Sequence, residues 1–406
     1  MNQSAHPTPL PLLEFVILMA FMSSLGALSI DAILPGLPMI GAELKVANPN
    51  DVQLIVSSIM LGMGLGQLFY GPFCDSLGRK PTLCLGVVVF LLGSVACIFA
   101  DSLETMLLGR LTQGFGVGAT RVVSLALIRD SYSGRHMSRV MSFIMMVFVT
   151  VPMIAPLLGQ TIIELSSWRM IFIAIGTMGL MTMTWFAIRQ PETLLPENKM
   201  PLTFKATVTG FKAVLSHKVV IAYTLGQGLV FGAFLAYLVS SQAIFEQIYG
   251  IVDEFPKYFA IMALAFGCGA VFNSKLVMKF GMRKMIYLSL PLYMSLALLM
   301  AVVSTLNNGA PNLLSFILFV TPLFFTLNVM FTNFNSLAMQ LMGHMAGVAA
   351  SVIGSISSFL GVACSFIIGQ QFNGTLTFFF VSYLVIGVIL IGLTWFAHRA
   401  CPDLQD

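Results

Sequence analysis

The chain has 406 residues, of which 58% are hydrophobic and only 9% are charged, with a formal net charge of +4. Soluble domains have about a quarter of their residues charged, so this composition excludes a water-soluble globular protein and predicts a membrane protein. Six cysteines without a C-x-x-C pair or a histidine cluster predict neither disulfides nor a metal site.

Charges, prolines and glycines separate twelve apolar segments. Each is about 20 residues or longer, the length of a membrane-spanning helix. The first follows a stretch without Lys or Arg, so we expect an uncleaved span rather than a signal peptide. The segments are 12–35, 51–71, 81–100, 104–127, 137–163, 168–188, 219–245, 255–275, 285–306, 312–335, 345–370 and 375–398.

The longest polar stretch, residues 189–218, divides these segments into six and six. The predicted fold class is therefore an all-α membrane protein with twelve transmembrane helices. Its predicted domains are an N-terminal six-helix half (1–188), a cytoplasmic linker (189–218) and a C-terminal six-helix half (219–406).

Positive charge predicts the orientation of the chain. Most of the 20 lysines and arginines lie in the even-numbered connections and at the C-terminus, and few lie in the odd-numbered ones. Because cytoplasmic loops are enriched in Lys and Arg, both termini are predicted to be cytoplasmic, with the protein in a bacterial inner membrane. The positive excess then lies on the cytoplasmic rim, which argues against a nucleic-acid partner.

Similar basic turns follow the second and eighth segments. GPFCDSLGRKPTL (71–83) and NSKLVMKFGMRKMIY (273–287) place Gly78 and Gly281 at matching positions in the two halves. Repeated halves are usual in secondary transporters, so the pattern favours a duplicated six-helix unit.

Three ionisable residues fall well inside apolar segments: Asp31, Arg110 and Arg121. Such groups are costly in a membrane unless they are paired or hydrated, and they mark functional sites by default. Asp31 and Arg110 are predicted at similar depths below the outer face, roughly 6 and 9 Å at 1.5 Å per helical residue. They can therefore pair directly or through water.

We interpret Asp31 and Arg110 as a proton-coupling pair. The guanidinium favours the ionised carboxylate, whereas removal from water favours the protonated form. The alternative is a structural ion pair that joins two helices. Arg121 lies about three turns after Arg110. It either lines the inner half of a cavity or bonds to backbone carbonyls near the cytoplasmic end.

Three motifs resemble the major facilitator superfamily. GPFCDSLGRKP (71–81) resembles its loop between spans 2 and 3, LLGRLTQGFGVGA (107–119) its proton-coupled span 4 motif, and VPMIAPLLGQ (151–160) its antiporter motif in span 5. IDAILPGLP, ALIRDSYSGRHMSRVMSF and SSWRMIF are similar to the bicyclomycin-resistance branch of drug/proton antiporters. The resemblance implies a major facilitator fold.

The loop motif predicts a latch on the cytoplasmic side. Gly71 and Gly78 allow close approach and a tight turn, and Arg79 can reach Asp130. Asp75 can accept hydrogen bonds from a helix N-terminus, which the resemblance identifies as span 11. The alternative is that the basic residues only set topology.

Span 5 contains Pro152, Pro156 and Gly159, which predict a bend and a close packing face. Ordinary use of proline and glycine in membrane helices is the alternative.

The resemblance implies that spans 1, 4, 7 and 10 line a central cavity. Each polar residue there can instead form hydrogen bonds between helices. Besides Arg121, the candidate cavity residues are Gln113, Tyr223, Gln227, Asn328 and Asn333.

These observations predict a proton-coupled antiporter that exports amphipathic drugs or related small organic compounds by alternating access. Its predicted partners are a small-molecule substrate, protons and the lipid bilayer, and a monomer is expected. Alternatives are a narrower exporter of a metabolite or siderophore, a proton-coupled importer, and a membrane-embedded enzyme or receptor. The sequence has no nucleotide-binding loop and no catalytic motif, so we predict neither an enzyme nor a cofactor.

Overall fold

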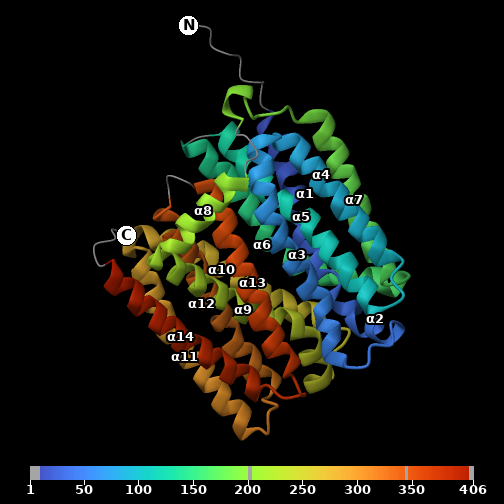
Figure 1. The fold of residues 1–406 in the computed structure, drawn as a ribbon. Coiled ribbons are helices and arrows are strands. Elements are labelled where there is room, and N and C mark those ends of the chain that lie inside the picture. Colours follow the sequence, from blue (N-terminus) through green and yellow to red (C-terminus); the bar gives the residue numbers. More distant parts are fainter. Residues whose placement is uncertain (1–9, 133, 200–203, 343–345, 402–406) are drawn as a thin grey trace. The chain divides into compact units, whose positions relative to one another are not determined.

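The computed structural model describes residues 10–132, 134–199, 204–342 and 346–401, and every regular element within these ranges is a helix (Figure 1). The predicted all-α fold class is therefore confirmed. The two chain ends, which the positive charges predict to be cytoplasmic, lie outside the described residues.

The helices appear in the order that the apolar segments predict. In the first half, the elements are α1 (Leu12–Asp31), η1 (Leu34–Gly36), α2 (Leu37–Glu43), η2 (Pro49–Gln53), α3 (Leu54–Ser76), α4 (Arg79–Ile98), α5 (Leu103–Ser131), α6 (Gly134–Leu165) and α7 (Arg169–Arg189). They are followed by η3 (Pro196–Asn198), α8 (Phe204–Ser216), α9 (Lys218–Tyr249), α10 (Phe255–Phe280), α11 (Met282–Leu306), α12 (Leu313–Gln340), α13 (Ala346–Gln370) and α14 (Thr377–Ala400). The helix α8, inside the linker, was not predicted.

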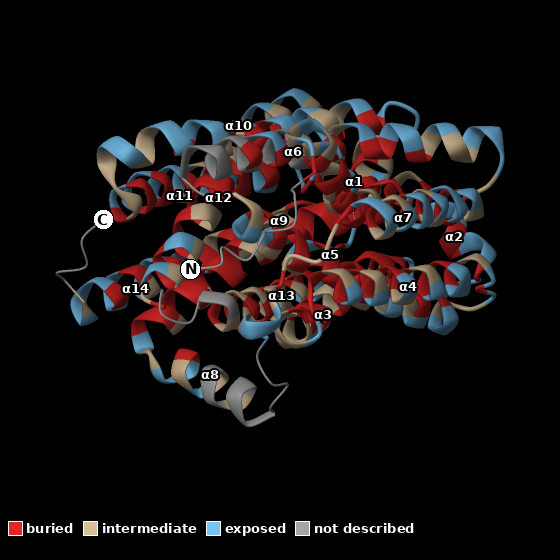
Figure 2. Cartoon of the chain, turned by 90° about the horizontal axis from the view of Figure 1, so that it is seen from above, coloured by how far each residue is buried: buried red, intermediate tan, exposed pale blue. Residues whose placement is uncertain are grey.

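Among the described residues, eleven helices are long and apolar enough to cross a membrane. The helix α6 has 32 residues, and its described apolar part is Thr150–Leu165. Large apolar side chains such as Leu92, Met278 and Leu314 are exposed, and Figure 2 shows exposed residues in pale blue along α4, α7 and α10. Lipid tails accommodate such apolar surfaces, as expected of a multi-pass membrane protein.

The chain packs into two compact units. One consists of Met1–Val46 and Ser58–Thr207, and the other of Ala47–Ser57 and Val208–Asp406. Within the first unit, α1 packs against α5, α6 and α7. Within the second unit, α9 packs against α12, α13 and α14.

Residues 47–57, which lead into α3, group with the second unit. The Asn50 amide donates to the main-chain oxygens of Gln370 at 3.2 Å and Phe372 at 2.9 Å. The Gln370 amide in turn donates to the Asp51 carboxylate at 3.1 Å. Short polar side chains thus attach this segment to residues far along the chain, whereas the predicted division followed chain order.

The helices α4 and α11 begin with the same kind of turn. Their N-cap residues are Gly78, with φ of 116° and ψ of 166°, and Gly281, with φ of 81° and ψ of 160°. Positive φ at this position favours glycine because it has no Cβ. The two glycines that the sequence matched between the halves therefore have similar backbone conformations, which supports an internal repeat.

The first span is interrupted where the sequence places its acid. The helix α1 ends at Asp31, inside the predicted segment 12–35, and the span continues through η1 and α2. Pro35 and Pro38 have no backbone N–H, so a continuous helix would lose two hydrogen bonds here. The last carbonyl groups of α1 are consequently open to donors from other helices.

The helix α6 packs directly against this interruption. A Cβ atom at Gly159 would lie 1.8 Å from the main-chain oxygen of Ala32, so only glycine fits without a shift of the helix. Pro152 and Pro156 lie inside α6, where each removes one N–H donor. The predicted hinge residues thus belong to the helix that contacts α1 next to Asp31.

A glutamate ties the beginning of α1 to the end of α7. Glu14 lies in the first turn of α1. Its carboxylate accepts from the Trp185 indole at 3.2 Å and from Nε and Nη2 of Arg189 at 2.8 and 2.9 Å. Such a bidentate contact with arginine fixes the relative orientation of the two side chains as well as pairing their charges.

A second glutamate ties the other end of the first span to the beginning of α7. Glu43 accepts from the Trp168 indole at 2.6 Å and forms an ion pair with Arg169. Arg169 also donates to the main-chain oxygens of Ile98 and Ala100, both at 3.0 Å, and its guanidinium lies 4.0 Å from the Trp168 ring centre. The first span and α7 are therefore held together at both ends.

We expect Arg169→Ala to lower the midpoint temperature of thermal unfolding in detergent by about 4 °C or more, because it removes an ion pair and two hydrogen bonds. Lys257→Ala is the matched control. It removes an exposed pair with Glu254 and should shift the midpoint by less than about 1 °C. Equal shifts for the two variants, followed by intrinsic fluorescence, would contradict this account.

We expect Gly159→Ala to lower the unfolding temperature, because the new methyl group collides with the backbone of α1. In an unobstructed helix the same change stabilises by up to about 1 kcal/mol. Gly176→Ala is such a control, since a Cβ there meets Ser94 at an ordinary 3.7 Å. Scanning calorimetry should therefore give shifts of opposite sign, and a raised temperature for Gly159→Ala would refute the close approach.

Candidate functional site

Asp31 is the last residue of α1 and is only 3% exposed. Its Oδ1 atom has no hydrogen-bond partner among the described residues. A carboxylate at this end of a helix faces the negative end of the helix dipole, and a buried acceptor without a donor is costly. The predicted acid thus lies inside the protein, away from lipid, in a position where a bound proton would remove the charge that opposes the helix dipole.

Arg110 of α5 binds the end of α1 through the main chain. Its Nη2 atom donates to the oxygen of Ser29 at 2.7 Å, and its Nη1 atom donates to Oε1 of Gln113 at 2.7 Å. The Gln113 amide then donates to Ser94 Oγ at 2.9 Å, and the Phe172 ring centre lies 5.7 Å from the guanidinium. Gln113, predicted as a cavity residue, is fully buried and orients Arg110.

Asp31 and Arg110 both lie at the end of α1, but their side chains do not form an ion pair. Within the described ranges, the ion pairs do not include these two side chains. The guanidinium instead contacts the chain two residues earlier, at Ser29. Of the predicted arrangements, direct pairing and a structural ion pair are therefore not formed in this conformation.

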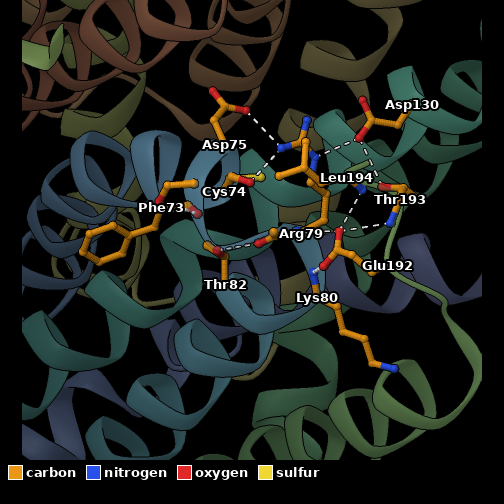
Figure 3. Close-up of polar contacts among 12 residues, drawn as sticks. Phe73, Cys74, Asp75, Arg79, Lys80, Thr82, Asp130, Glu192, Thr193 and Leu194 are labelled. Carbon is orange, nitrogen blue, oxygen red and sulfur yellow. Dashed lines mark hydrogen bonds and ion pairs between the residues drawn. The ribbon is translucent and has the colours of Figure 1, made fainter. Parts of the chain in front are cut away.

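The loop motif forms a buried network around Arg79, which is 4% exposed (Figure 3). Its Nε atom donates to Asp130 at 2.8 Å. Its Nη1 atom donates to Asp75 at 3.0 Å and to the main-chain oxygen of Cys74 at 2.7 Å. Arg79 therefore links the ends of α3 and α5, with Gly71 one turn before Asp75 on α3.

Sequence reasoning missed Glu192, which completes this network (Figure 3). Its carboxylate accepts from the backbone N–H groups of Arg79 at 2.9 Å and Lys80 at 3.0 Å. The next residue, Thr193, donates its hydroxyl to Asp130 at 3.1 Å. The available signal was an acid four residues beyond the sixth predicted segment (168–188), on the side predicted for the loop motif.

Arg121 is exposed on α5, ten residues before the helix ends. It forms no hydrogen bond or ion pair with any residue that the structure describes. Of the two predicted positions, bonding to backbone carbonyls is therefore not observed. The side chain is exposed on α5, within the predicted span 104–127.

Tyr223 and Asn333, two of the predicted cavity residues in the second unit, join neighbouring helices. The Tyr223 hydroxyl accepts from Nε of Arg283 at 3.2 Å, and Arg283 also donates to the main-chain oxygen of Cys401 at 2.5 Å. The Asn333 amide donates to Asn273 at 2.6 Å. Both match the alternative of hydrogen bonding between helices.

Gln227 and Asn328 differ from these two. Each is buried, and the amide oxygen of each has no hydrogen-bond partner among the described residues. Tyr237, which sequence reasoning missed, is similar: its hydroxyl is buried without a described partner, and its ring lies 4.6 Å from that of Phe324. These groups lie on α9 and α12, the helices of the seventh and tenth predicted segments.

Aromatic pairs also join α9 and α12. Phe231 of α9 lies 5.9 Å from Phe331 of α12, and Phe234 lies 5.9 Å from Phe324, measured between ring centres. Gln227 precedes Phe231 by one helical turn, and Asn328 lies between Phe324 and Phe331 in the sequence of α12. A few polar groups among aromatic side chains are typical of sites for small organic ligands.

Comparison with known proteins identifies the family. The sequence pattern of the Major Facilitator Superfamily matches residues 18–366. A bicyclomycin resistance protein homolog from Haemophilus influenzae is 32% identical over 349 residues, which cover 86% of both chains. The multidrug resistance protein MdtL from Escherichia coli is 30% identical over 240 residues, which cover 59% of both chains.

Solved structures show the same fold. The xylose transporter XylE from Escherichia coli, in a partially occluded inward-open conformation, gives a TM-score of 0.74 at 14% identity, covering 97% of this chain and 99% of the other. The human organic anion transporter MFSD10 gives 0.71 at 16% identity, covering 95% and 99%. The family and fold predicted from the loop, span 4 and span 5 motifs are confirmed. The chain belongs to the major facilitator superfamily and is a membrane transporter, not an enzyme.

Proposed function

We propose that this protein exports amphipathic organic compounds across a bacterial inner membrane in exchange for protons. The compound class is supported by relatives named for resistance to bicyclomycin and to multiple drugs. The distribution of lysine and arginine supports cytoplasmic termini. The protein acts as a monomer in this proposal.

The buried acid at the end of α1 carries the proposal of proton coupling. Asp31 has an open acceptor atom, and Arg110 holds the neighbouring carbonyl of Ser29. A proton taken up from the outside neutralises the carboxylate, and its release to the cytoplasm restores the charge. Because the two forms interact differently with the helix end and the guanidinium, they favour different conformations.

The Arg79 network serves as the cytoplasmic latch. It closes this side while the protein is open to the outside, and it breaks when the protein opens inward. The two acids that bind Arg79, Asp75 and Asp130, come from different helices. A relative movement of α3 and α5 therefore disrupts the network.

The substrate contacts the aromatic surface of α9 and α12, where Gln227 and Asn328 supply open acceptor atoms. Gln113, Tyr223 and Asn333 support the helices instead of binding substrate. An aromatic wall with few fixed charges tolerates varied amphipathic molecules and suits a broad exporter better than one for a single metabolite or siderophore.

A proton-coupled importer is the second candidate. A D-xylose–proton symporter shares the fold with a TM-score of 0.74 at 16% identity. The direction of proton movement separates the two functions. In acid-loaded proteoliposomes, addition of bicyclomycin should release protons if the protein exchanges them for substrate, and co-uptake of protons would indicate import.

We expect Asp31→Asn to abolish this proton response, because asparagine cannot exchange a proton. An entrapped pH-sensitive dye measures the effect, which should be a decrease of about 100-fold or to background. Asp253→Asn, at an exposed acid, should retain the response. Full pH-driven transport by Asp31→Asn would refute the role of Asp31.

We expect Arg79→Ala to lower the transport rate about tenfold or more, since it breaks three hydrogen bonds at one buried site. Arg79→Lys should not restore it, because an ammonium group cannot reproduce the planar fork of donors. Lys80→Ala is the control, and Figure 3 shows its side chain pointing away from the network. Similar rates for Arg79→Ala and Lys80→Ala would favour a role in topology alone.

A further inference from the structure

The segment after α7 provides the N-terminal cap of α4. Its N-cap residue is Gly78, which has no side chain to accept a hydrogen bond from the first turn. Glu192 fills this role across more than a hundred residues of chain: Oε1 accepts from the N–H of Arg79 and Oε2 from that of Lys80. Since the third helical residue is Pro81 and has no N–H, both open donors in the first three positions are satisfied.

The electrostatics of α4 require an acid at this point. The first two residues of the helix, Arg79 and Lys80, are basic, and positive charge is unfavourable at the positive end of a helix dipole. The Glu192 carboxylate compensates for both the dipole and the basic residues. A Cβ atom at Gly78 would lie 2.5 Å from Glu192 Oε2, so the glycine also makes room for the carboxylate.

The same segment contacts the partner of the latch arginine. Glu192 Oε1 also accepts from the backbone N–H groups of Thr193 at 3.0 Å and Leu194 at 2.9 Å, which fold the segment around the carboxylate. Thr193 then donates to Asp130 Oδ2, the atom that accepts from Arg79 Nε. Glu192 thus holds the backbone of Arg79, and Thr193 holds Asp130, which accepts from the Arg79 side chain.

We propose that Glu192 is a positioning residue of the latch, and that it ties the start of the segment between the two halves to the closed state of Arg79. This inference rests on the proposed latch. The carboxylate sets the direction of the first turn of α4, so that the Arg79 guanidinium reaches both acids. Displacement of residues 192–194 would release the arginine, which makes the latch responsive to the segment that joins the two halves.

Cys74 reports on the latch without a transport assay. It is buried beside Arg79, which donates to its main-chain oxygen. In a variant whose other five cysteines are replaced by alanine or serine, reconstituted in nanodiscs, mass spectrometry follows N-ethylmaleimide labelling of Cys74. We expect Glu192→Gln to label about tenfold faster, because it loses charge-assisted hydrogen bonds. Glu197→Gln, an exposed glutamate in the same segment, should label at the parent rate.

A double variant separates positioning from simple helix stabilisation. If Glu192 acts through Arg79, Arg79→Ala combined with Glu192→Gln labels no faster than Arg79→Ala alone. A further increase in the double variant, with a matching additive loss of thermal stability, would overturn the positioning role.

The remaining outcomes distinguish this inference from the proposed latch. Faster labelling in Arg79→Ala with an unchanged rate in Glu192→Gln overturns the inference and leaves the latch standing. Unchanged labelling in both variants overturns both.

Discussion

A charged side chain in the hydrocarbon region must find its partners within the protein, and Arg110 does so at the broken end of α1. Pro35 and Pro38 end the helix, the carbonyl of Ser29 is open, and Arg110 donates to it. The interruption, the buried arginine and the neighbouring acid therefore belong to one arrangement. Without the open carbonyl, the guanidinium would lose a main-chain acceptor. Without the cation, the end of α1 would hold an acid against an uncompensated dipole.

The rest of the first unit keeps that arrangement in place. Glu14 and Glu43 attach the two ends of the first span to α7, and Gly159 lets α6 touch the backbone beside the acid. The span between two such fixed ends has little freedom to slide. In the proposed transport cycle, the carboxyl group therefore moves with its helix neighbours, and a change in its charge acts on the unit as a whole.

The sequence predicted the conformation and contacts of the loop motif, because short motifs fix the residue types that each position requires. The turn at Gly78 and the approach of Arg79 toward Asp130 follow from a short loop with a basic residue opposite an acid. The polar residues of the cavity were harder to assign, because an amide inside a span either faces a ligand or bonds a neighbouring helix. Gln113 and Asn333 form hydrogen bonds with neighbouring helices, whereas Gln227 retains an oxygen without a described partner. A rotation of each helix by a fraction of a turn separates these outcomes, and a single sequence does not encode that rotation in any local pattern.

The sequence by itself determined the membrane class, the order of the helices and the family, because hydropathy, charge and short motifs are properties of contiguous residues. It also located the acid and the arginines that a bilayer makes costly. The tertiary structure alone decided which groups they meet: Arg110 binds a carbonyl instead of Asp31, and Glu192 caps a helix that begins more than a hundred residues earlier. Such contacts depend on how the helices pack and on which backbone groups their ends leave unsatisfied.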